Sequence, residues 1–278
     1  MKLFRTRQGI YVEDGGSYFQ IPGVTWDELV AHDDLHKYLG EIARLSNPAG
    51  ELRAEDIEAP IGSQEVWAAG VTYYRSRNAR MEESKEAGGG SFYDRVYSAE
   101  RPELFFKAVA SRVVGPGRAV RIRRDAKWSV PEPELTLVIK PSGKIIGYTV
   151  GNDMSSRDIE GENPLYLPQA KVYDGSCALG PCVLISPDLM PSSAGIQIEI
   201  LRAGQVEFAG KTTLAEMKRN PQVLADYLYR ECTFSAGSYL MTGTGIIPPD
   251  SFALHCGDQI RITIDGIGTL INHVDANA

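Results

Sequence analysis

The sequence predicts an α+β fold with extensive antiparallel sheet. Short runs of β-branched and aliphatic residues recur along the chain, and several pairs of them enclose Gly-containing turns of the hairpin type. One clear helical pattern appears late in the chain, at residues 220–228, and the other helical stretches are shorter. Strands and helices do not alternate in the order that parallel α/β folds require. Together these three observations favour α+β.

Composition is that of an ordinary soluble protein. The chain has 278 residues, 43% of them hydrophobic and 23% charged, which suits one large domain with or without a small appendage. A net charge of −7 argues against nucleic acid as a partner. No apolar run approaches the ~20 residues of a membrane helix, and residues 1–7 lack the apolar core of a signal peptide. We therefore expect no membrane partner and a cytoplasmic location.

Cysteine and histidine show no metal-ligand spacing. The four cysteines form no C-x-x-C pair, so we interpret them as reduced, mostly buried thiols. They are Cys177, Cys182, Cys232 and Cys256. The four histidines are equally scattered, which argues against a zinc site.

Residues 1–59 are predicted to form a small N-terminal α/β unit. Two strand-like runs, 9–12 and 17–21, flank a Gly-Gly turn and predict a hairpin. Thr25 is a good cap for a helix that begins at Trp26. Nothing in this unit suggests chemistry. We place the boundary near Pro60, so that residues 60–278 form the main domain.

The main domain is predicted to open with a strand, 66–73, which runs into a polar helix at 74–83. The following stretch, 84–91, contains three glycines, Gly88 to Gly90, and is either a surface loop or a lid over a site. Glu103 and Lys107 then bracket an apolar segment, and by themselves they predict an ordinary surface ion pair.

Two carboxylates two residues apart mark the candidate site. Glu132 and Glu134 precede a run of aliphatic residues, so a strand at 130–139 would point both side chains to one face. Like charges side by side repel unless a cation or a proton lies between them. Oxygen ligands of this kind suit Mg²⁺, although an exposed acidic strand end would show the same spacing.

The next strand supplies a third acid. A turn at 141–144 leads into residues 145–153, which read as the return strand of a hairpin that ends on Asp153. Antiparallel pairing would bring Asp153 beside the Glu pair. Three protein oxygens leave open coordination positions for water and substrate, as a catalytic Mg²⁺ site requires.

Later elements supply further candidate residues for the site. A turn or short helix at 155–159 carries Arg157, whose planar guanidinium suits a carboxylate. Lys171 follows Gln169; near a cation it can act as a base, but it can equally be a structural ion-pair partner. Thr244, in a tight loop at 242–245, is either a hydroxyl donor to substrate or only a turn residue.

The remaining elements predict structure rather than chemistry. Runs 196–202 and 206–210 predict a half-exposed hairpin, and runs 259–264 and 267–270 predict a closing one. Asn220 and Pro221 form a good helix start. The face that we expect to cover the core contains Val223, Leu224, Tyr227 and Leu228.

These motifs resemble the fumarylacetoacetate hydrolase family. The pattern E-x-E is followed about twenty residues on by G-Y-x-x-x-N-D-x-S-x-R-D, and later by K-V-Y-D-G-S-C-A-L-G-P, T-G-T and G-I-G-T-L-I-N. The matches run in order from about Ala69 to Val274. The resemblance implies the family's mixed β-roll fold, usually as a homodimer. It also favours functional roles for Lys171 and Thr244.

One difference from the hydrolases of this family narrows the range of reactions that the chain is expected to catalyse. Their G-L-N-Y-x-x-H pattern carries a histidine base, and Ser76 stands at that position here. A serine without a partner is not a base at neutral pH. G-V-T-Y-x-R-S-R followed by R-P-E-L-F-F-K instead resembles one branch of the family, the 2-keto-3-deoxy-D-arabinonate dehydratases, in which a Glu occupies the place of Glu103.

The resemblance implies Mg²⁺-dependent dehydration of a 2-keto-3-deoxy sugar acid, arabinonate or xylonate, to 2,5-dioxopentanoate in pentose catabolism. Mn²⁺ is a possible substitute. Expected metal ligands are Glu132, Glu134 and Asp153; expected catalytic residues are Lys171, Glu103 and Ser76; expected substrate-binding residues are Arg75, Arg157, Gln169 and Thr244. Two alternatives stay open: a C–C hydrolase of acylpyruvates, and a non-catalytic protein that binds sugar acids.

Overall fold

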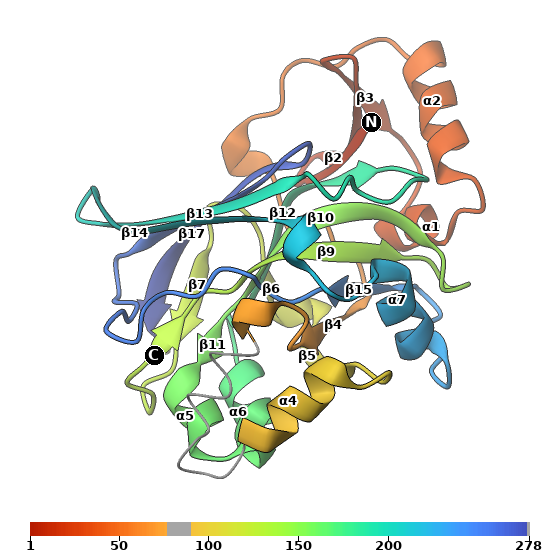
Figure 1. Cartoon of the computed structure of the whole chain (residues 1–278). Helices are drawn as coiled ribbons and strands as arrows, with labels where there is room; N and C mark the ends of the chain where they lie inside the picture. The colour runs from red at the N-terminus through yellow and green to blue at the C-terminus, as the bar shows by residue number, and fades with distance from the viewer. Residues whose placement is uncertain (77–89, 277–278) are drawn as a thin grey trace.

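Two mainly antiparallel sheets, of ten and five strands, form the body of the protein (Figure 1). The structure is a computed structural model, and it describes residues 1–76 and 90–276. In spatial order the large sheet contains β3 (Ser17–Ile21), β2 (Gly9–Asp14), β1 (Lys2–Thr6), β12 (Cys177–Ile185), β10 (Ile145–Asp153), β9 (Pro133–Ile139), β15 (Ser238–Met241), β4 (Glu65–Gly70) and β5 (Glu103–Val109), with β6 (Val113–Val114) beside β12. Only the β15–β4 and β12–β6 pairs of this sheet are parallel.

The second sheet packs on one face of the first. Its strands, in order, are β14 (Gln205–Thr213), β13 (Gly195–Arg202), β16 (Gln259–Ile264), β17 (Gly268–Ala276) and β7 (Ala119–Ile122). A separate pair joins β8 (Ser129–Val130) to β11 (Ser155–Ser156). Aliphatic side chains of β13 and β16 meet those of β9 and form the main core. All seven residues of β9 are buried, so this strand lies at the centre of the molecule.

The helices whose bounds lie within the described residues are short. They are α1 (Trp26–Ala31), α2 (Leu35–Leu45), α4 (Gly90–Ser98), α5 (Arg157–Glu162), α6 (Leu167–Lys171) and α7 (Pro221–Tyr229), with 3₁₀ turns η1 (Ala54–Asp56), η2 (Ala110–Arg112), η3 (Pro164–Tyr166) and η4 (Leu214–Glu216). In Figure 1, α1 and α2 lie at one end of the molecule, and α4, α5 and α6 gather at the other. No helix among the described residues is long and apolar enough to cross a membrane.

The predicted N-terminal hairpin and helix start are confirmed. β2 and β3 pair around the Gly-Gly turn, and Thr25 and Glu28 form a reciprocal capping box at the start of α1. These elements are continuous with the rest of the fold, because β1 pairs with β12 and α1 and α2 cover the outer face of the large sheet. The domain division at residue 60 stays a prediction, and one sheet runs across it.

Several expectations need correction. The first strand of the main domain ends at Gly70 and not at residue 73, because Val71 adopts a left-handed conformation with φ of 54° and turns the chain. On α7 the buried residues are Leu224, Ala225 and Leu228, whereas Val223 is 38% exposed because it lies off the face that meets the core.

The cysteine and loop predictions also change. Cys177 and Cys182 are buried within β12, but Cys232 and Cys256 are exposed, so only half of the thiols are buried. Of the predicted helix 74–83, only 74–76 lie in the described part of the chain, and they are helical. The loop or lid predicted at 84–91 falls largely outside the described residues, and α4 begins at Gly90.

Candidate metal centre and active site

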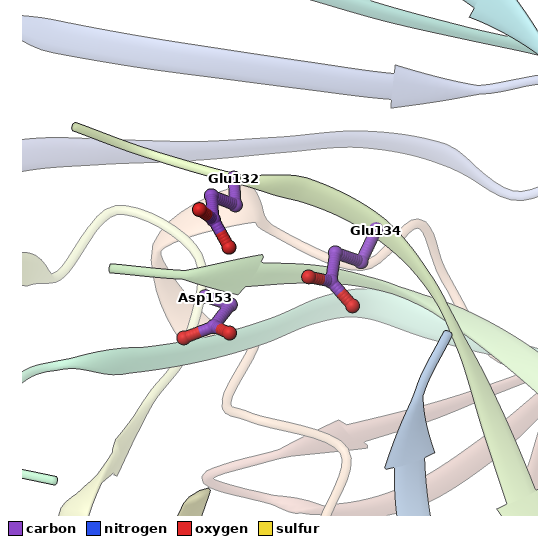
Figure 2. A group of neighbouring side chains, drawn as sticks. All are labelled: Glu132, Glu134 and Asp153. Atoms are coloured by element: carbon purple, nitrogen blue, oxygen red, sulfur yellow. The ribbon is translucent and has the colours of Figure 1, made fainter. Parts of the chain in front are cut away.

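Three buried carboxylates converge where β9 and β10 meet (Figure 2). Glu134 lies on β9, and Glu132 lies just before this strand; in the ladder Gly151 is opposite Glu134. The Asp153 amide donates to the Glu132 carbonyl oxygen at 3.0 Å, which extends the hairpin to its last residue. The predicted hairpin therefore brings the third acid to the other two, and one oxygen from each lies within 4.8 Å of the others.

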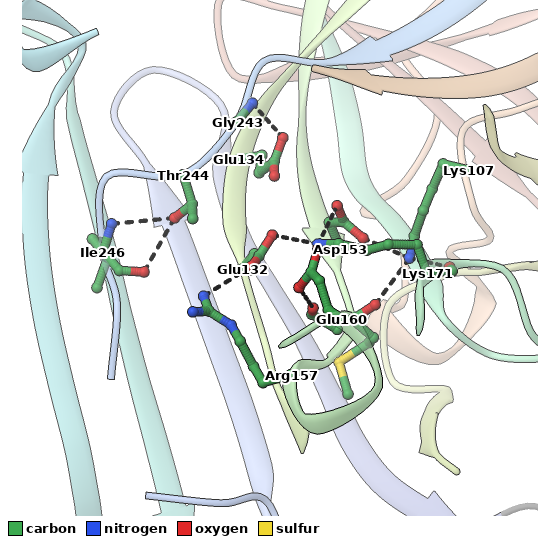
Figure 3. A network of polar contacts seen from close by, with 12 residues as sticks. Lys107, Glu132, Glu134, Asp153, Arg157, Glu160, Lys171, Gly243, Thr244 and Ile246 are labelled. Carbon is green, nitrogen blue, oxygen red and sulfur yellow. Dashed lines mark hydrogen bonds and ion pairs between the residues drawn. The ribbon is translucent and has the colours of Figure 1, made fainter. Parts of the chain in front are cut away.

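Buried cations balance these acids (Figure 3). The Lys171 ammonium, at the end of α6, donates to Glu132 Oε2 at 2.6 Å and to Asp153 Oδ2 at 3.0 Å. Arg157, at the start of α5, donates to Glu132 Oε1 at 3.0 Å. Both side chains are almost fully buried. Each is thus a partner of the carboxylates. For Lys171 the sequence left such an ion pair open, whereas Arg157 was expected to bind a substrate carboxylate and here contacts Glu132.

A third buried cation was missed by the sequence analysis. Lys107 on β5 is fully buried and pairs with Asp153 Oδ1 at 2.5 Å, so the expected surface ion pair with Glu103 is wrong. Its ammonium also donates to the carbonyl oxygens of Met154 and Lys171, at 3.0 and 2.5 Å. Burial lowers the pKa of Lys107, against the opposing effect of Asp153. The apolar segment around Lys107 was the one available signal that it points inward.

The carboxyl group of Glu134 lies in a perturbed environment. Burial, and next the negative charges of Asp153 and Glu132, raise the pKa of Glu134 well above its ordinary value. Its Oε2 accepts a hydrogen bond from the Gly243 amide at 2.5 Å. Gly243 has φ of 90°, and a Cβ there would lie 2.0 Å from Thr72 Oγ1, so only glycine fits this approach.

The donor set suits a hard divalent cation. All three ligands are carboxylate oxygens, the type that Mg²⁺ prefers, and neighbouring oxygens around six-coordinate Mg²⁺ are about 3 Å apart. One oxygen from each acid lies within 4.8 Å of the others, so the side chains would need to draw only slightly closer to reach that spacing. Burial, and next the charges of Asp153 and Glu132, raise the pKa of Glu134, and a divalent cation beside it would stabilise its ionised form. The three carboxylates therefore fit Mg²⁺.

The cavity at the carboxylates is small, about 20 Å³. This is space for a single water-sized species rather than a sugar acid. Ser76, Thr244 and Phe105 help to line it. The Ser76 hydroxyl donates to the Tyr73 carbonyl oxygen at 2.8 Å and accepts from the Tyr73 amide. The Thr244 hydroxyl is similarly tied to Ile246, at 3.2 Å.

The other predicted residues lie further out. Glu103 stands opposite Gly70 in the β4–β5 ladder, and a Cβ on Gly70 would lie 1.9 Å from Glu103 Oε2, so the carboxylate covers that glycine. Gly70 itself lines the small cavity. Arg75 is exposed and lines a separate, larger cavity of about 570 Å³, whose lining includes Gly245, the residue after Thr244. Gln169 is exposed on α6 and is not among the residues that line either cavity.

An oxygen-only donor set beside a buried lysine defines a class of enzyme site that binds a divalent cation and moves protons. Comparison with known proteins agrees with that class. The sequence profile of the family described as "Fumarylacetoacetate (FAA) hydrolase C-terminal" matches residues 71–275. The chain belongs to this family.

Relatives with related activities cover nearly the whole chain. A protein of Haloferax volcanii described as "Probable 2-keto-3-deoxyxylonate dehydratase" is 44% identical over 90% of this chain and 92% of its own. The "2-dehydro-3-deoxy-D-arabinonate dehydratase" of Saccharolobus solfataricus is 38% identical over 99% and 96%. A solved structure, "2-keto-3-deoxy-D-arabinonate dehydratase complexed with magnesium and 2,5-dioxopentanoate", aligns with a TM-score of 0.85 at 35% identity over 100% and 99% of the two chains.

Proposed function

We propose that this chain catalyses the Mg²⁺-dependent dehydration of a 2-keto-3-deoxy-pentonate to 2,5-dioxopentanoate. The observation that carries the proposal is the buried triad of Glu132, Glu134 and Asp153 with Lys171 bonded to two of its members. The near full-length relatives described as dehydratases of such acids, and the solved relative with magnesium and 2,5-dioxopentanoate, support the same reaction.

The triad would hold the cation. When bound there, the cation supplies positive charge that stabilises the enolate of a 2-keto acid and lowers the proton affinity of a neighbouring amine. The chain itself keeps the three carboxylates in place through the Gly243 amide, Lys107 and Arg157. These contacts fix side chains that would otherwise separate, because like charges repel.

Lys171 is the base in this proposal. Its side chain is fully buried, and burial disfavours the charged ammonium. It reaches the carboxylates from α6, and its ammonium lies 5.8 Å from the centre of the Phe105 ring. The ammonium must first give its proton to solvent, and the amine that results takes one proton from C3 of the substrate.

Glu103 and Ser76 form what we call the leaving-group side. Glu103 donates a proton to the C4 hydroxyl, directly or through a water molecule, and Ser76 orients that hydroxyl. The C4–O bond breaks, one water leaves, and the C3 proton stays on Lys171. Isomerisation of the unsaturated keto acid then gives 2,5-dioxopentanoate. The position of Glu103 against Gly70, a residue that lines the cavity, supports this role.

Four residues are proposed to bind substrate. Arg157 and Thr244 are the inner pair, because both line the cavity at the triad. Arg75 would meet the far end of the substrate, since it lines the larger cavity nearby. Gln169, whose side chain is exposed on α6, is the fourth.

The direct test is an assay of the purified chain with 2-keto-3-deoxy-arabinonate and -xylonate, with Mg²⁺ and with EDTA. We expect water loss and an aldehyde product that EDTA abolishes, and a smaller rate with Mn²⁺. Pyruvate released from an acylpyruvate, without any aldehyde from the sugar acids, would replace this proposal by C–C hydrolysis. Binding of the sugar acids without turnover would indicate a non-catalytic protein.

A homodimer in the cytoplasm completes the proposal. The family resemblance supports the dimer, and light scattering on the purified chain tests it. The location is supported by the cysteines, all four of which are free thiols, as expected in a reducing compartment.

A further inference from the structure

Two consecutive basic residues, Lys218 and Arg219, connect parts of the fold that are far apart in sequence. They lie between η4 and α7, far along the chain from residues 72–76 and 96–103. Both of these segments are nevertheless bonded to them. Neither Lys218 nor Arg219 lines the cavity at the triad. Their contacts therefore need an explanation other than direct contact with the substrate.

Arg219 holds the end of α4. Its guanidinium donates to the carbonyl oxygens of Val96 and Ala99, at 2.8 and 2.7 Å, and to that of Glu100 at 2.8 Å. Carbonyl groups at a helix C-terminus have no partner within the helix, and a cation there also meets the negative end of the helix dipole. One side chain thus fixes the exit from α4, three residues before Glu103.

Lys218 holds both segments at once. Its ammonium donates to the Tyr97 carbonyl oxygen at 2.5 Å and lies 4.1 Å from the centre of the Tyr97 ring. Its amide donates to the Thr72 carbonyl oxygen at 3.0 Å, and the neighbouring Met217 forms a bridge with Tyr73. The two segments also touch directly, because the rings of Tyr74 and Tyr97 meet edge to face at 6.3 Å.

The segment held at Thr72 is under strain. Val71, immediately before it, has φ of 54°, an uncommon conformation for a β-branched residue. Such a residue persists only where its surroundings hold it. Two hydrogen bonds do so here: the one from the Lys218 amide, and one from Thr72 Oγ1 to the Thr242 carbonyl oxygen at 2.6 Å. Five residues after Val71 comes Ser76.

We infer that Lys218 and Arg219 are positioning residues for the leaving-group side of the active site. They tie residues 72–76, which include Ser76, to the segment that leads into Glu103, and they leave the triad and Lys171 untouched. The inference rests on the proposed function and assigns residues that control the loss of the C4 hydroxyl but not the removal of the C3 proton.

The test separates these two events. The variants Arg219→Ala, Arg219→Lys and Lys218→Met are compared with wild type in three measurements on the full chain with Mg²⁺. The first is dehydration of the sugar acid. The second is exchange of the C3 hydrogens of 2-oxopentanoate in D₂O, a substrate that has no C4 hydroxyl. The third is Mg²⁺ affinity by calorimetry.

We expect Arg219→Ala to lower kcat for dehydration at least about tenfold, since misplacing a reacting group by 1 Å can cost ~10²-fold. Exchange of 2-oxopentanoate and Mg²⁺ affinity should stay within about twofold of wild type. Arg219→Lys should recover part of the rate, because one ammonium still reaches a helix carbonyl. Lys218→Met, which keeps its backbone bond to Thr72, should have the smallest effect.

Arg53→Ala is the control, because Arg53 is a surface arginine that pairs with Asp56 at 2.7 Å but lies in the N-terminal unit. Equal losses of exchange and dehydration in Arg219→Ala would overturn the inference, as would unchanged dehydration. If Arg219→Ala unfolds at the assay temperature, Arg219→Lys and Lys218→Met carry the comparison under the same criteria. A wild-type chain that exchanges 2-oxopentanoate but dehydrates no sugar acid would refute the proposed function itself, and the inference with it.

Discussion

The metal centre and the leaving-group side are built in opposite ways. The metal centre draws its three acids and Lys171 from residues 132–171, and a single hairpin supplies the geometry of the acids. The leaving-group side draws Ser76 and Glu103 from the two ends of residues 76–103, and a third segment at Lys218 and Arg219 holds both. The first is buried and rich in charge pairs; the second depends on backbone carbonyls near the surface. We therefore expect changes in the two regions to separate cation binding from loss of the hydroxyl.

The largest effect is expected from Asp153→Asn. Asp153 contributes to the triad and also pairs with Lys107 and Lys171, so the change removes a ligand and leaves two buried ammonium groups with one carboxylate fewer. Loss of a residue that only hydrogen-bonds to a metal ligand costs up to ~100-fold in affinity. Because Asp153 is itself a ligand, its loss should lower Mg²⁺ affinity by more than that, and the dehydration rate should fall with it. Calorimetry and the aldehyde assay measure both. Asp174→Asn, at an exposed aspartate, is the control; near-normal Mg²⁺ binding by Asp153→Asn would remove Asp153 from the centre.

Lys171→Met should separate chemistry from cation binding. Loss of a proton-transferring residue costs ~10²–10⁴-fold in rate. Mg²⁺ should still bind, because the three carboxylates remain and one competing cation is gone. Solvent deuterium exchange at C3 of 2-oxopentanoate should fall in parallel with dehydration. Exchange at the wild-type rate would show that another group takes the proton.

Lys107→Met should act mainly on stability. Removing one partner of a buried ion pair costs ~3–5 kcal/mol, since the other charge stays buried, and here Asp153 Oδ1 loses its lysine. Added Mg²⁺ should raise the melting temperature of the variant more than that of wild type, because the cation replaces the lost charge. Lys140→Met is the matched control, as Lys140 pairs with the exposed Asp33. Equal destabilisation by the two changes would contradict the assigned role of Lys107.

Gly70→Ala tests the leaving-group side. The added Cβ would lie 1.9 Å from Glu103 Oε2 and would push that carboxylate away. Dehydration should fall by up to ~10²-fold, with Mg²⁺ affinity and C3 exchange unchanged. In Gly40→Ala, on α2, the Cβ would have no atom within 4 Å, and that variant should behave as wild type. A fall in Mg²⁺ affinity in Gly70→Ala would show that the two regions are not separable.

The smallest effect is expected outside both regions, at Asp258. Burial alone would raise the pKa of Asp258, but hydrogen bonds from Arg202 and the His255 amide outweigh it and lower the pKa. A lowered pKa adds stability above the unfolded value, near 3.9, and this stability is lost as the pH falls through the folded value. The difference in melting temperature between wild type and Asp258→Asn should therefore be largest at neutral pH and shrink below about pH 4. A difference independent of pH would contradict the ion pair.

Predictions from the sequence worked best where structure is local. The hairpin of β9 and β10 follows from alternation and a turn, and the pairing of Asp153 with the Glu pair follows from the hairpin. The Asn220 cap of α7 is confirmed for the same reason. The predictions that Val223 faces the core, that the cysteines are mostly buried and that the first strand reaches residue 73 were wrong. Each of these features depends on which distant element packs against the residue.

The sequence by itself determined the fold class, the acid triad and the likeness to a family of keto-acid enzymes, because residue period, turn chemistry and motif order are written in neighbouring positions. Only the tertiary structure decided that Lys107 points inward to Asp153 and that Arg219 holds the end of α4. Both contacts join segments far apart in the chain, and the burial that makes a lysine an internal counter-ion or an arginine a helix cap exists only after those segments have packed together.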